Sequence, residues 1–570
     1  MNSLNNWRAF ISPRVDEASA QNLAAPLPES LSLTGETIAG RDFSTPECQI
    51  DLDALALPGE AFAVESVAIV ATVVHCKEAR HVRLGFGTDW WISVFVNGVQ
   101  IGTTFPAGNV VASFSCWDHI YEADFQAGDN VISCLVKRGA GGWLFAAAEL
   151  PDMPMRLSPG LFQRIYLDSP ERLTCPPYLQ PWEKGLSLCV KLNNPGTAVL
   201  DWREKGSNEW KRMEPALESW QVPVGIFHRF ILTDLRPGAS YECRVTTMDD
   251  FMRNPVEEPP MTFRLPGGTD GHSIYLTADL QLPEYKRRPI IRRLFQSSEA
   301  QRADLFCTLG DMDNSSQDIC HSYFDIVLDE MLQPRPQAPI WLPIRGNHEM
   351  TRGESSQWEH FFGSTFFLFR YGDTAYLALD TAEERIPPDD STFYSRRTRL
   401  NALFPAQREW IQKAISSPEF TTARHHIVLS HGTPFIQDAI SREQPYPFMA
   451  RNLETLVGDF FYGPDAPVKP DLWLCGHTHR YVRFDPHSQT MAAFPGYSHY
   501  LADEEKDRYQ FPIIVLDGTG GIGPKEGCGV LLDISEKSID CTVREPDGTL
   551  IDHLAISKDG SIDVLDTVLP

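Results

Sequence analysis

Polar residues follow apolar, strand-like runs at five places in the second half of the chain. The runs read "HSIYLTADLQ", "DLFCTLGDMDN", "APIWLPIRGNHE", "HHIVLSHGTP" and "DLWLCGHTH". They end, in that order, in Asp279 and Gln281, Asp311 and Asn314, Asn347 and His348, His431, and His477 and His479. Ligands bind beyond the carboxyl ends of strands in α/β folds, so we expect these five ends to line one cleft.

The side chains at these ends are metal donors. Carboxylate, amide and imidazole groups suit Zn, Mn or Fe, and no cysteine takes part. A single Asp or His at a strand end is more often a cap, but the ordered set predicts a metal site. Gly310, Gly346 and Gly476 are expected to adopt backbone conformations that turn the next side chain into the cleft.

Size and composition indicate a multidomain chain rich in strands. The 570 residues exceed what a single core holds and suggest roughly three or four domains. The 43 prolines and 39 glycines favour strand-rich modules with many turns over long helices. A formal charge of −26 argues against a long nucleic-acid groove, because phosphate backbones require clustered Lys and Arg.

The sequence leads us to expect neither a membrane span nor a signal peptide. Apolar runs stay below the roughly 18 to 20 residues that cross a bilayer, and "MNSLNNWRAFISPRVDEASA" lacks an apolar h-region. We therefore expect a cytoplasmic protein without a membrane partner, while a secreted or periplasmic location and the oligomeric state stay open. The twelve scattered cysteines are expected to be buried free thiols rather than disulfides.

Three stretches of different texture predict three domains. Residues 1–165 and 170–266 show short strands between turns, including an Asn97–Gly98 hairpin signal, and predict two β-sandwiches. Residues 270–570 alternate apolar strands with amphipathic stretches, which predicts an α/β catalytic domain. The predicted fold class is therefore two all-β sandwich domains followed by a layered α/β domain.

Two resemblances refine the sandwich predictions. The phrases "GTDWWISVFVNG" and "GDNVISCLVKRGAGGWLF" resemble galactose-binding or jelly-roll modules, some of which bind sugars. The phrase "LTDLRPGASYECRV" is similar to fibronectin type III domains, and especially to the small domain that precedes the catalytic domain of purple acid phosphatases. Any other β-sandwich would predict almost the same structure.

The ordered motifs D-x-(H/Q), GDxx(N/D), GNH(E/D), a lone His and GHxH resemble those of calcineurin-like metallophosphoesterases. The resemblance covers about residues 270 to 535 and implies a double β-sheet flanked by helices, with two metal ions. It places Asp311 between the ions. It assigns Asp279, Gln281 and His479 to the first metal, and Asn347, His431 and His477 to the second.

Two departures from this pattern affect the metals. The first motif is most often D-x-H, so Gln281 replaces an imidazole with a neutral amide, which should weaken the first metal. In purple acid phosphatases a Tyr binds ferric iron at the position that Asn314 holds here. The resemblance therefore implies two divalent ions (Mn, Fe or Zn) and a protein that is not purple.

The implied reaction is hydrolysis of a phosphate monoester or diester by metal-activated hydroxide. His348 is the candidate acid that protonates the leaving group, and Asn314 would orient it through a neutral amide. His499 and Arg352 are candidate substrate contacts. Glu349 and Arg352 could support the ligands or contact substrate, but for each of them a surface salt bridge or a helix-start position is an equal alternative.

Two other classes of function remain as alternatives. One is a metal-containing carbohydrate-binding protein with weak or no hydrolase activity, and the other is a module whose metals are purely structural. The intact GNHE and GHTH motifs favour the enzyme, because a structural site does not require His348 beside an open coordination position. The expected partner is a small phosphate ester, including a sugar-linked one; the natural substrate is left open.

Overall fold

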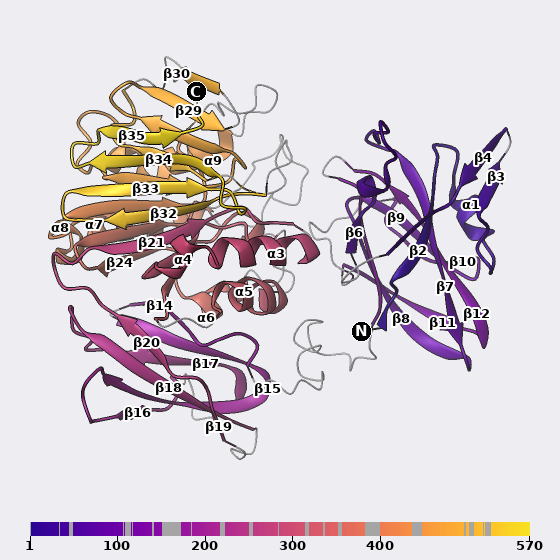
Figure 1. Ribbon diagram of the computed structural model, residues 1–570, viewed down its shortest axis with the longest axis horizontal. Helices are drawn as coiled ribbons and strands as arrows, with labels where there is room; N and C mark the ends of the chain where they lie inside the picture. Colours follow the sequence, from indigo (N-terminus) through magenta and orange to yellow (C-terminus); the bar gives the residue numbers. More distant parts are fainter. Residues whose placement is uncertain are drawn as a thin grey trace. The chain divides into compact units, whose positions relative to one another are not determined.

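The computed structural model of the protein forms two compact units. One holds Met1–Gln163 and Pro283–Lys286, and the other holds Arg164–Leu282 and Arg287–Pro570 (Figure 1). The structure describes all residues except 1, 34, 45–48, 107, 109–115, 117, 140–141, 151–172, 184, 217–222, 250–254, 283, 314–318, 334–336, 351–355, 382–399, 436–446, 495–496, 501–504, 506, 517, 519–525 and 570.

The first unit is built from antiparallel sheets. A five-stranded sheet contains β1 (Asn2–Ser3), β13 (Leu144–Leu150), β8 (Arg80–Thr88), β11 (His119–Phe125) and β6 (Gln49–Asp51). A six-stranded sheet runs in the order β10 (Val99–Thr103), β9 (Trp91–Val96), β12 (Gly128–Lys137), β7 (Val67–Cys76), β2 (Asn6–Ile11) and β5 (Arg41–Ser44). Smaller elements are β3 (Ser30–Leu33), β4 (Glu36–Ala39), α1 (Glu17–Gln21) and the 3₁₀ helix η2 (Leu52–Leu55).

Both of the larger sheets contribute to one buried core in this unit. Phe86 of β8 belongs to the same apolar cluster as Val94 of β9. The predicted hairpin is confirmed: Val96 pairs with Val99, and the two residues between them have φ values of 49° and 78°. Such values are typical of type I′ turns, which match the twist of paired strands. The likeness to galactose-binding modules stays a prediction.

The second unit contains two larger sheets. The first follows the order β19 (Val256–Glu257), β18 (Ser240–Asp249), β15 (Gly185–Glu204), β14 (Tyr178–Trp182), β23 (Ile340–Pro343), β22 (Leu305–Thr308), β21 (His272–Thr277), β32 (Gly529–Ile534), β33 (Ser538–Arg544), β34 (Leu550–Ser557) and β35 (Ile562–Thr567), with β16 (Lys211–Met213), β17 (Gly225–Leu232) and β20 (Met261–Arg264) paired beside it. The second follows β24 (Phe367–Tyr371), β25 (Thr374–Leu379), β26 (His425–Ser430), β27 (Leu472–Cys475), β31 (Ile513–Val515), β28 (Tyr481–Asp485), β29 (Thr490–Phe494) and β30 (Tyr497–Tyr500).

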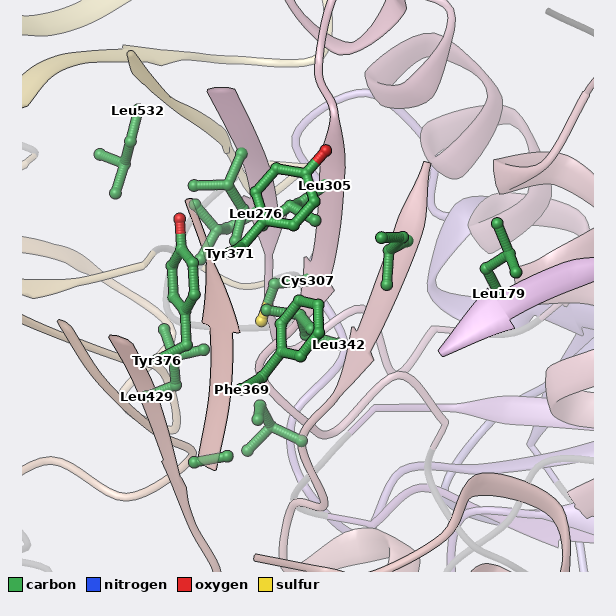
Figure 2. Packing of buried hydrophobic residues seen from close by; sticks show 14 of the residues in the cluster. Leu179, Leu276, Leu305, Cys307, Leu342, Phe369, Tyr371, Tyr376, Leu429 and Leu532 are labelled. Carbon is green, nitrogen blue, oxygen red and sulfur yellow. The ribbon is translucent and has the colours of Figure 1, made fainter. Parts of the chain in front are cut away.

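The central core of this unit lies between the two sheets (Figure 2). Alternation along each strand selects the buried face, because successive side chains point to opposite sides of a sheet. On β22, Leu305 and Cys307 join the central core, whereas Phe306 packs in a separate cluster on the outer face. On the second sheet, Tyr376 and Leu429 complete the central core.

Helices cover the outer faces of both sheets. Residues of α3 (Glu284–Phe295), α4 (Ser298–Gln301) and the π-helix η4 (Cys320–Leu328) pack on the first sheet, and residues of α7 (Leu400–Ile415) and α9 (Pro447–Phe461) pack on the second. Short helices are α5 (Asp329–Met331), η5 (His348–Met350), α6 (Trp358–Phe362) and α8 (Pro418–Thr421). The predicted fold class, β-sheet domains followed by a double sheet flanked by helices, is confirmed.

The strands of residues 178–264 are continuous with the first sheet of the α/β part. β14 pairs with β23 in parallel, with Leu179 opposite Ile340. Leu188 and Phe230 of this segment share the central core with Leu342 of β23. The boundaries predicted for the three domains therefore stay predictions, while this segment and the α/β part form one compact unit.

The thiol prediction is confirmed where the structure describes the chain. Eleven cysteines are buried and form no disulfide within the described part of the chain, and the twelfth, Cys48, lies outside that part. None of the described helices is long and apolar enough to cross a membrane.

A buried histidine between the two sheets predicts acid sensitivity. His272 of β21 is 2.7 Å from the Tyr376 hydroxyl, and burial, aided by nearby Arg264 and His425, lowers the pKa of His272 to about 3. In the unfolded chain this histidine binds a proton near pH 6.5, whereas in the folded protein it stays neutral down to about pH 3. The free energy of unfolding should therefore fall by about 1.4 kcal/mol per pH unit as the pH drops from 6.5 toward 3. His272→Gln should reduce this slope in urea denaturation between pH 4 and 7. His487→Gln, on an exposed side chain, is the control, and an unchanged slope in the His272 variant would contradict the assignment.

Candidate metal centre

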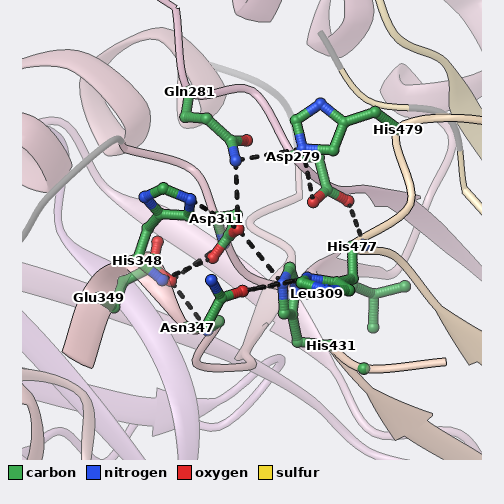
Figure 3. Close-up of polar contacts among 12 residues, drawn as sticks. Asp279, Gln281, Leu309, Asp311, Asn347, His348, Glu349, His431, His477 and His479 are labelled. Carbon is green, nitrogen blue, oxygen red and sulfur yellow. Dashed lines mark hydrogen bonds and ion pairs between the residues drawn. The ribbon is translucent and has the colours of Figure 1, made fainter. Parts of the chain in front are cut away.

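The two sheets bring the predicted strand ends together (Figure 3). β21, β22 and β23 run parallel in the first sheet, and β26 and β27 run parallel in the second. Hydrogen bonds join the loops that follow the strands of the two sheets. Nδ1 of His431 lies 2.8 Å from the Leu309 carbonyl, and the His477 amide donates to Asp279 Oδ2 at 2.8 Å. The prediction that these ends line one site is therefore met by the geometry.

One half of the site gathers two imidazoles, an amide oxygen and a carboxylate. Asn347 Oδ1 is 2.9 Å from His431 Nε2 and 3.1 Å from His477 Nδ1, and the two ring nitrogens are 3.3 Å apart. Donor atoms of Asp311, His431 and His477 all lie within 4.8 Å of one another. The Leu309 carbonyl can only accept, so it fixes the Nδ1–H tautomer of His431 and leaves the Nε2 lone pair for a cation.

Asp311 lies at the centre of the cluster. Its Oδ2 is 3.3 Å from His431 Nε2 on one side and accepts from Gln281 Nε2 at 3.1 Å on the other. Its Oδ1 accepts from the backbone amide of His348 at 2.9 Å. This fully buried carboxylate therefore contacts both halves of the predicted ligand set, as a bridging ligand must.

The other half contains Asp279, Gln281 and His479. His479 Nε2 is 3.6 Å from Asp279 Oδ1 and 3.2 Å from Gln281 Nε2. The Oε1 atom of Gln281 is buried and has no hydrogen-bond partner among the described residues. An unpaired buried acceptor is costly, and a cation would satisfy it. Gln281 directs Nε2 at Asp311 and His479, so this donor set fits a metal once the amide is turned over and Oε1 becomes the ligand atom.

The electrostatics of the cluster favour added positive charge. Burial raises the pKa of Asp279 well above its usual range, and the neighbouring Asp311 carboxylate adds to the rise. Burial acts against the charged form of His431, yet the carboxylates of Asp311 and Asp279 raise the pKa of that ring to about 10. Burial also opposes ionisation of Asp311, but His431 and His348 hold its pKa below the usual range. The carboxylates thus favour a positively charged His431. Divalent ions bound in the cluster would supply positive charge in place of that proton.

Four predicted ligands have left-handed backbone conformations. The φ values are 55° for Asp279, 53° for Asp311, 76° for His477 and 55° for His479. Each non-glycine residue in this region costs about 1–2 kcal/mol. The ligands themselves make the sharp turns that place their side chains in the cluster, and such strain is concentrated at functional sites.

The glycine prediction is corrected in part. Gly310 has a φ of 91°, as expected, but Gly346 and Gly476 are not in the left-handed region. Gly346 is required for close approach instead, because a Cβ there would lie 2.1 Å from Asp311 Oδ1 and 2.5 Å from the Asp311 amide nitrogen. A larger residue would separate the loops that follow β22 and β23.

The structure describes only some of the predicted catalytic and substrate-binding side chains. His348 Nε2 lies 3.7 Å from Asp311 Oδ2, and its side chain is 17% exposed, so it borders the cluster and reaches the surface. Asn314 and Arg352 lie outside the described residues. His499 is on β30, where its backbone pairs with Met491, and its side chain is outside the description. The roles given to these last three residues stay predictions.

Glu349 has a structural task that its motif position did not reveal. Its carboxylate is buried and accepts four hydrogen bonds. Oε2 accepts from the amides of Asp311 at 2.9 Å and Gly346 at 2.8 Å, and Oε1 accepts from the Met312 amide at 2.9 Å and the Tyr323 hydroxyl at 2.7 Å. The surface salt bridge considered for Glu349 is therefore wrong. Glu349 joins the loop that carries Asp311 to the loop that carries Asn347.

A family model described as calcineurin-like phosphoesterase matches residues 272–481. This part of the chain is therefore a calcineurin-like phosphoesterase domain. Among solved structures, the purple acid phosphatase PPD1 from yellow lupin (Lupinus luteus) seeds is 12% identical over 87% of this chain and 93% of that chain, with a TM-score of 0.49. PhoD is 11% identical over 70% and 94%, with a TM-score of 0.48. A dimetal phosphatase from Danio rerio is 12% identical over 50% and 99%, with a TM-score of 0.33. No curated protein matches the sequence.

Glu349→Gln should loosen the centre. The amide would place an NH₂ group against backbone N–H or hydroxyl donors, so part of the four-bond arrangement must be lost. Loss of such a supporting bond to a metal site typically costs 10- to 100-fold in metal affinity or activity, about the change we expect in a metal titration. The control is Glu359→Gln, on the exposed face of α6. Equal metal affinity for both variants would show that Glu349 does not hold the loops.

Proposed function

We propose, from the calcineurin-like phosphoesterase domain at residues 272–481, that the protein is a dinuclear metal-dependent phosphoesterase acting on a phosphate monoester or diester. The observation that carries this proposal is the position of Asp311, a buried carboxylate in contact with both donor groups. The narrower likeness to purple acid phosphatases is part of the same proposal. The substrate would be a small phosphate ester, including a sugar-linked one.

The chain offers ligands for two divalent ions. Asp279, Gln281 and His479 would hold one ion; Asn347, His431 and His477 would hold the other; Asp311 would contact both. When bound, two such ions polarise a phosphoryl group, neutralise its developing charge and acidify a water molecule. The oxygen and imidazole donors suit Mn, Fe or Zn.

His348 is the residue best placed to move a proton. Its backbone amide donates to Asp311 Oδ1, which holds the backbone from which the side chain extends. Its partly exposed ring borders the cluster. A leaving alkoxide needs a proton in the transition state, and a positioned side chain that supplies it contributes about 10²- to 10⁴-fold. His348 would donate that proton as a general acid.

His348→Ala should keep both metals and lose rate. We expect kcat to fall by about 10²-fold or more for alkyl phosphate esters, and less for aryl esters whose leaving groups need little protonation. The measurement is steady-state hydrolysis of alkyl and aryl monoesters and diesters, together with metal analysis of the same preparations. This panel also decides between a monoesterase and a diesterase.

The control for this experiment is His426→Ala, a half-buried histidine at the opposite end of β26 from His431. Its activity should equal that of the unmodified protein. A protein that binds two metals and cleaves neither class of ester, with or without His348, would refute the enzyme proposal. That result would favour the metal-containing carbohydrate-binding alternative, which glycan binding by the same preparation would then test.

A further inference from the structure

A sixth strand of the double sheet also ends in polar residues beside the site. β25 pairs in parallel with β26, so its carboxyl end lies at the same edge of the sheet as the end that carries His431. Asp380 and Thr381 follow it directly, and they are 0% and 1% exposed. Neither residue belongs to the predicted ligand set. Two buried polar side chains at this edge therefore need another explanation.

Asp380 holds the loop that follows β23. Its Oδ2 accepts from a terminal nitrogen of Arg345 at 2.5 Å, and the two side chains are 0% and 14% exposed. Arg345 immediately precedes Gly346 and Asn347. The backbone of Asp380 is itself fixed by Gln407 of α7, which accepts from the Asp380 amide at 3.0 Å and donates to its carbonyl at 2.9 Å. Asp380, which anchors this loop, is thus held at both its backbone N–H and its backbone carbonyl group.

Thr381 holds the neighbouring loop that follows β26. Its hydroxyl oxygen accepts from the Gly432 amide at 2.9 Å, and Gly432 immediately follows His431. The two loops held by these adjacent residues carry Asn347 and His431, whose side chains lie 2.9 Å apart. One buried dipeptide therefore bonds to both ligand loops.

We propose that Asp380 and Thr381 are positioning residues for the half of the metal centre formed by Asn347, His431 and His477. This inference rests on the proposed function, because it assumes that this half binds a metal. Metal ligands are held in place by partners outside the coordination sphere, and losing such a partner typically weakens metal binding or activity about 10- to 100-fold. Removing the Asp380 charge would also leave the Arg345 guanidinium, mostly buried, without its carboxylate.

The test uses Asp380→Asn and Thr381→Val in the full chain, with matched controls at the other end of β25. Asp373→Asn removes a carboxylate bound to Arg370 and Arg424, and Thr374→Val replaces an equally buried threonine. Zn²⁺ and Mn²⁺ titrations should show one of the two ions bound about 10- to 100-fold more weakly in the test variants and both unchanged in the controls. In hydrolysis, kcat should fall more than KM changes.

The Arg345→Gln exchange adds a second readout. If Asp380 acts through Arg345, the double variant should bind metal no more weakly than Asp380→Asn alone, because the two residues form one unit. Unchanged metal binding and kcat in both test variants would overturn the proposal, as would equal losses in the Asp373 and Thr374 controls. Thr381→Val decides the case if Asp380→Asn does not fold. An unmodified protein that binds two ions but hydrolyses nothing would refute the proposed function alone, since the titrations still test positioning.

Discussion

Four buried carboxylates, Asp279, Asp311, Glu349 and Asp380, lie at the carboxyl edge of the double sheet, and the site depends on how their charges are compensated. Removing an ion from water costs several kcal/mol even after relaxation of its surroundings, roughly the scale of a whole domain's stability margin. Glu349 is compensated within the chain, by three amides and a tyrosine hydroxyl. Asp279 and Asp311 each accept one backbone amide and also face imidazole nitrogens, which can bind either a proton or a metal cation. The fold thus compensates Glu349 with fixed dipoles alone and Asp380 with an arginine, and it leaves Asp279 and Asp311 to be completed by protons or metal ions.

The fold places these groups by stacking two sheets whose parallel strands end at one edge. A core of alternating apolar side chains fixes the strands, so their ends cannot drift apart as isolated loops could. Left-handed residues then turn the ligands inward, at about 1–2 kcal/mol each, which only a large surrounding core can offset. Gly346 allows the closest approach of two of the loops.

The sequence predicted the strand ends well because the signal is local: an apolar run followed by Asp, Asn or His. The same pattern, in "YLALDT", would also have indicated Asp380, but an aspartate and a threonine outside the five ordered motifs did not stand out. Glu349 could not be assigned, because three of its four partners are backbone amides that no sequence pattern identifies. The orientation of the Gln281 amide and the pairing of Leu179 with Ile340 depend likewise on contacts between distant segments.

The parallel pairing of β14 with β23 makes the strands of residues 178–264 part of the sheet that carries Asp279, Asp311 and Asn347. A chain shortened to begin after residue 264 would expose the backbone of β23 as a new sheet border. Such borders offer unpaired amides and carbonyls to other chains and promote aggregation. The exposed strand would be the one that leads into Arg345, Gly346 and Asn347, so intermolecular pairing would begin next to the predicted ligand Asn347. β14 therefore keeps β23, the strand before the GNHE motif, paired within its own molecule.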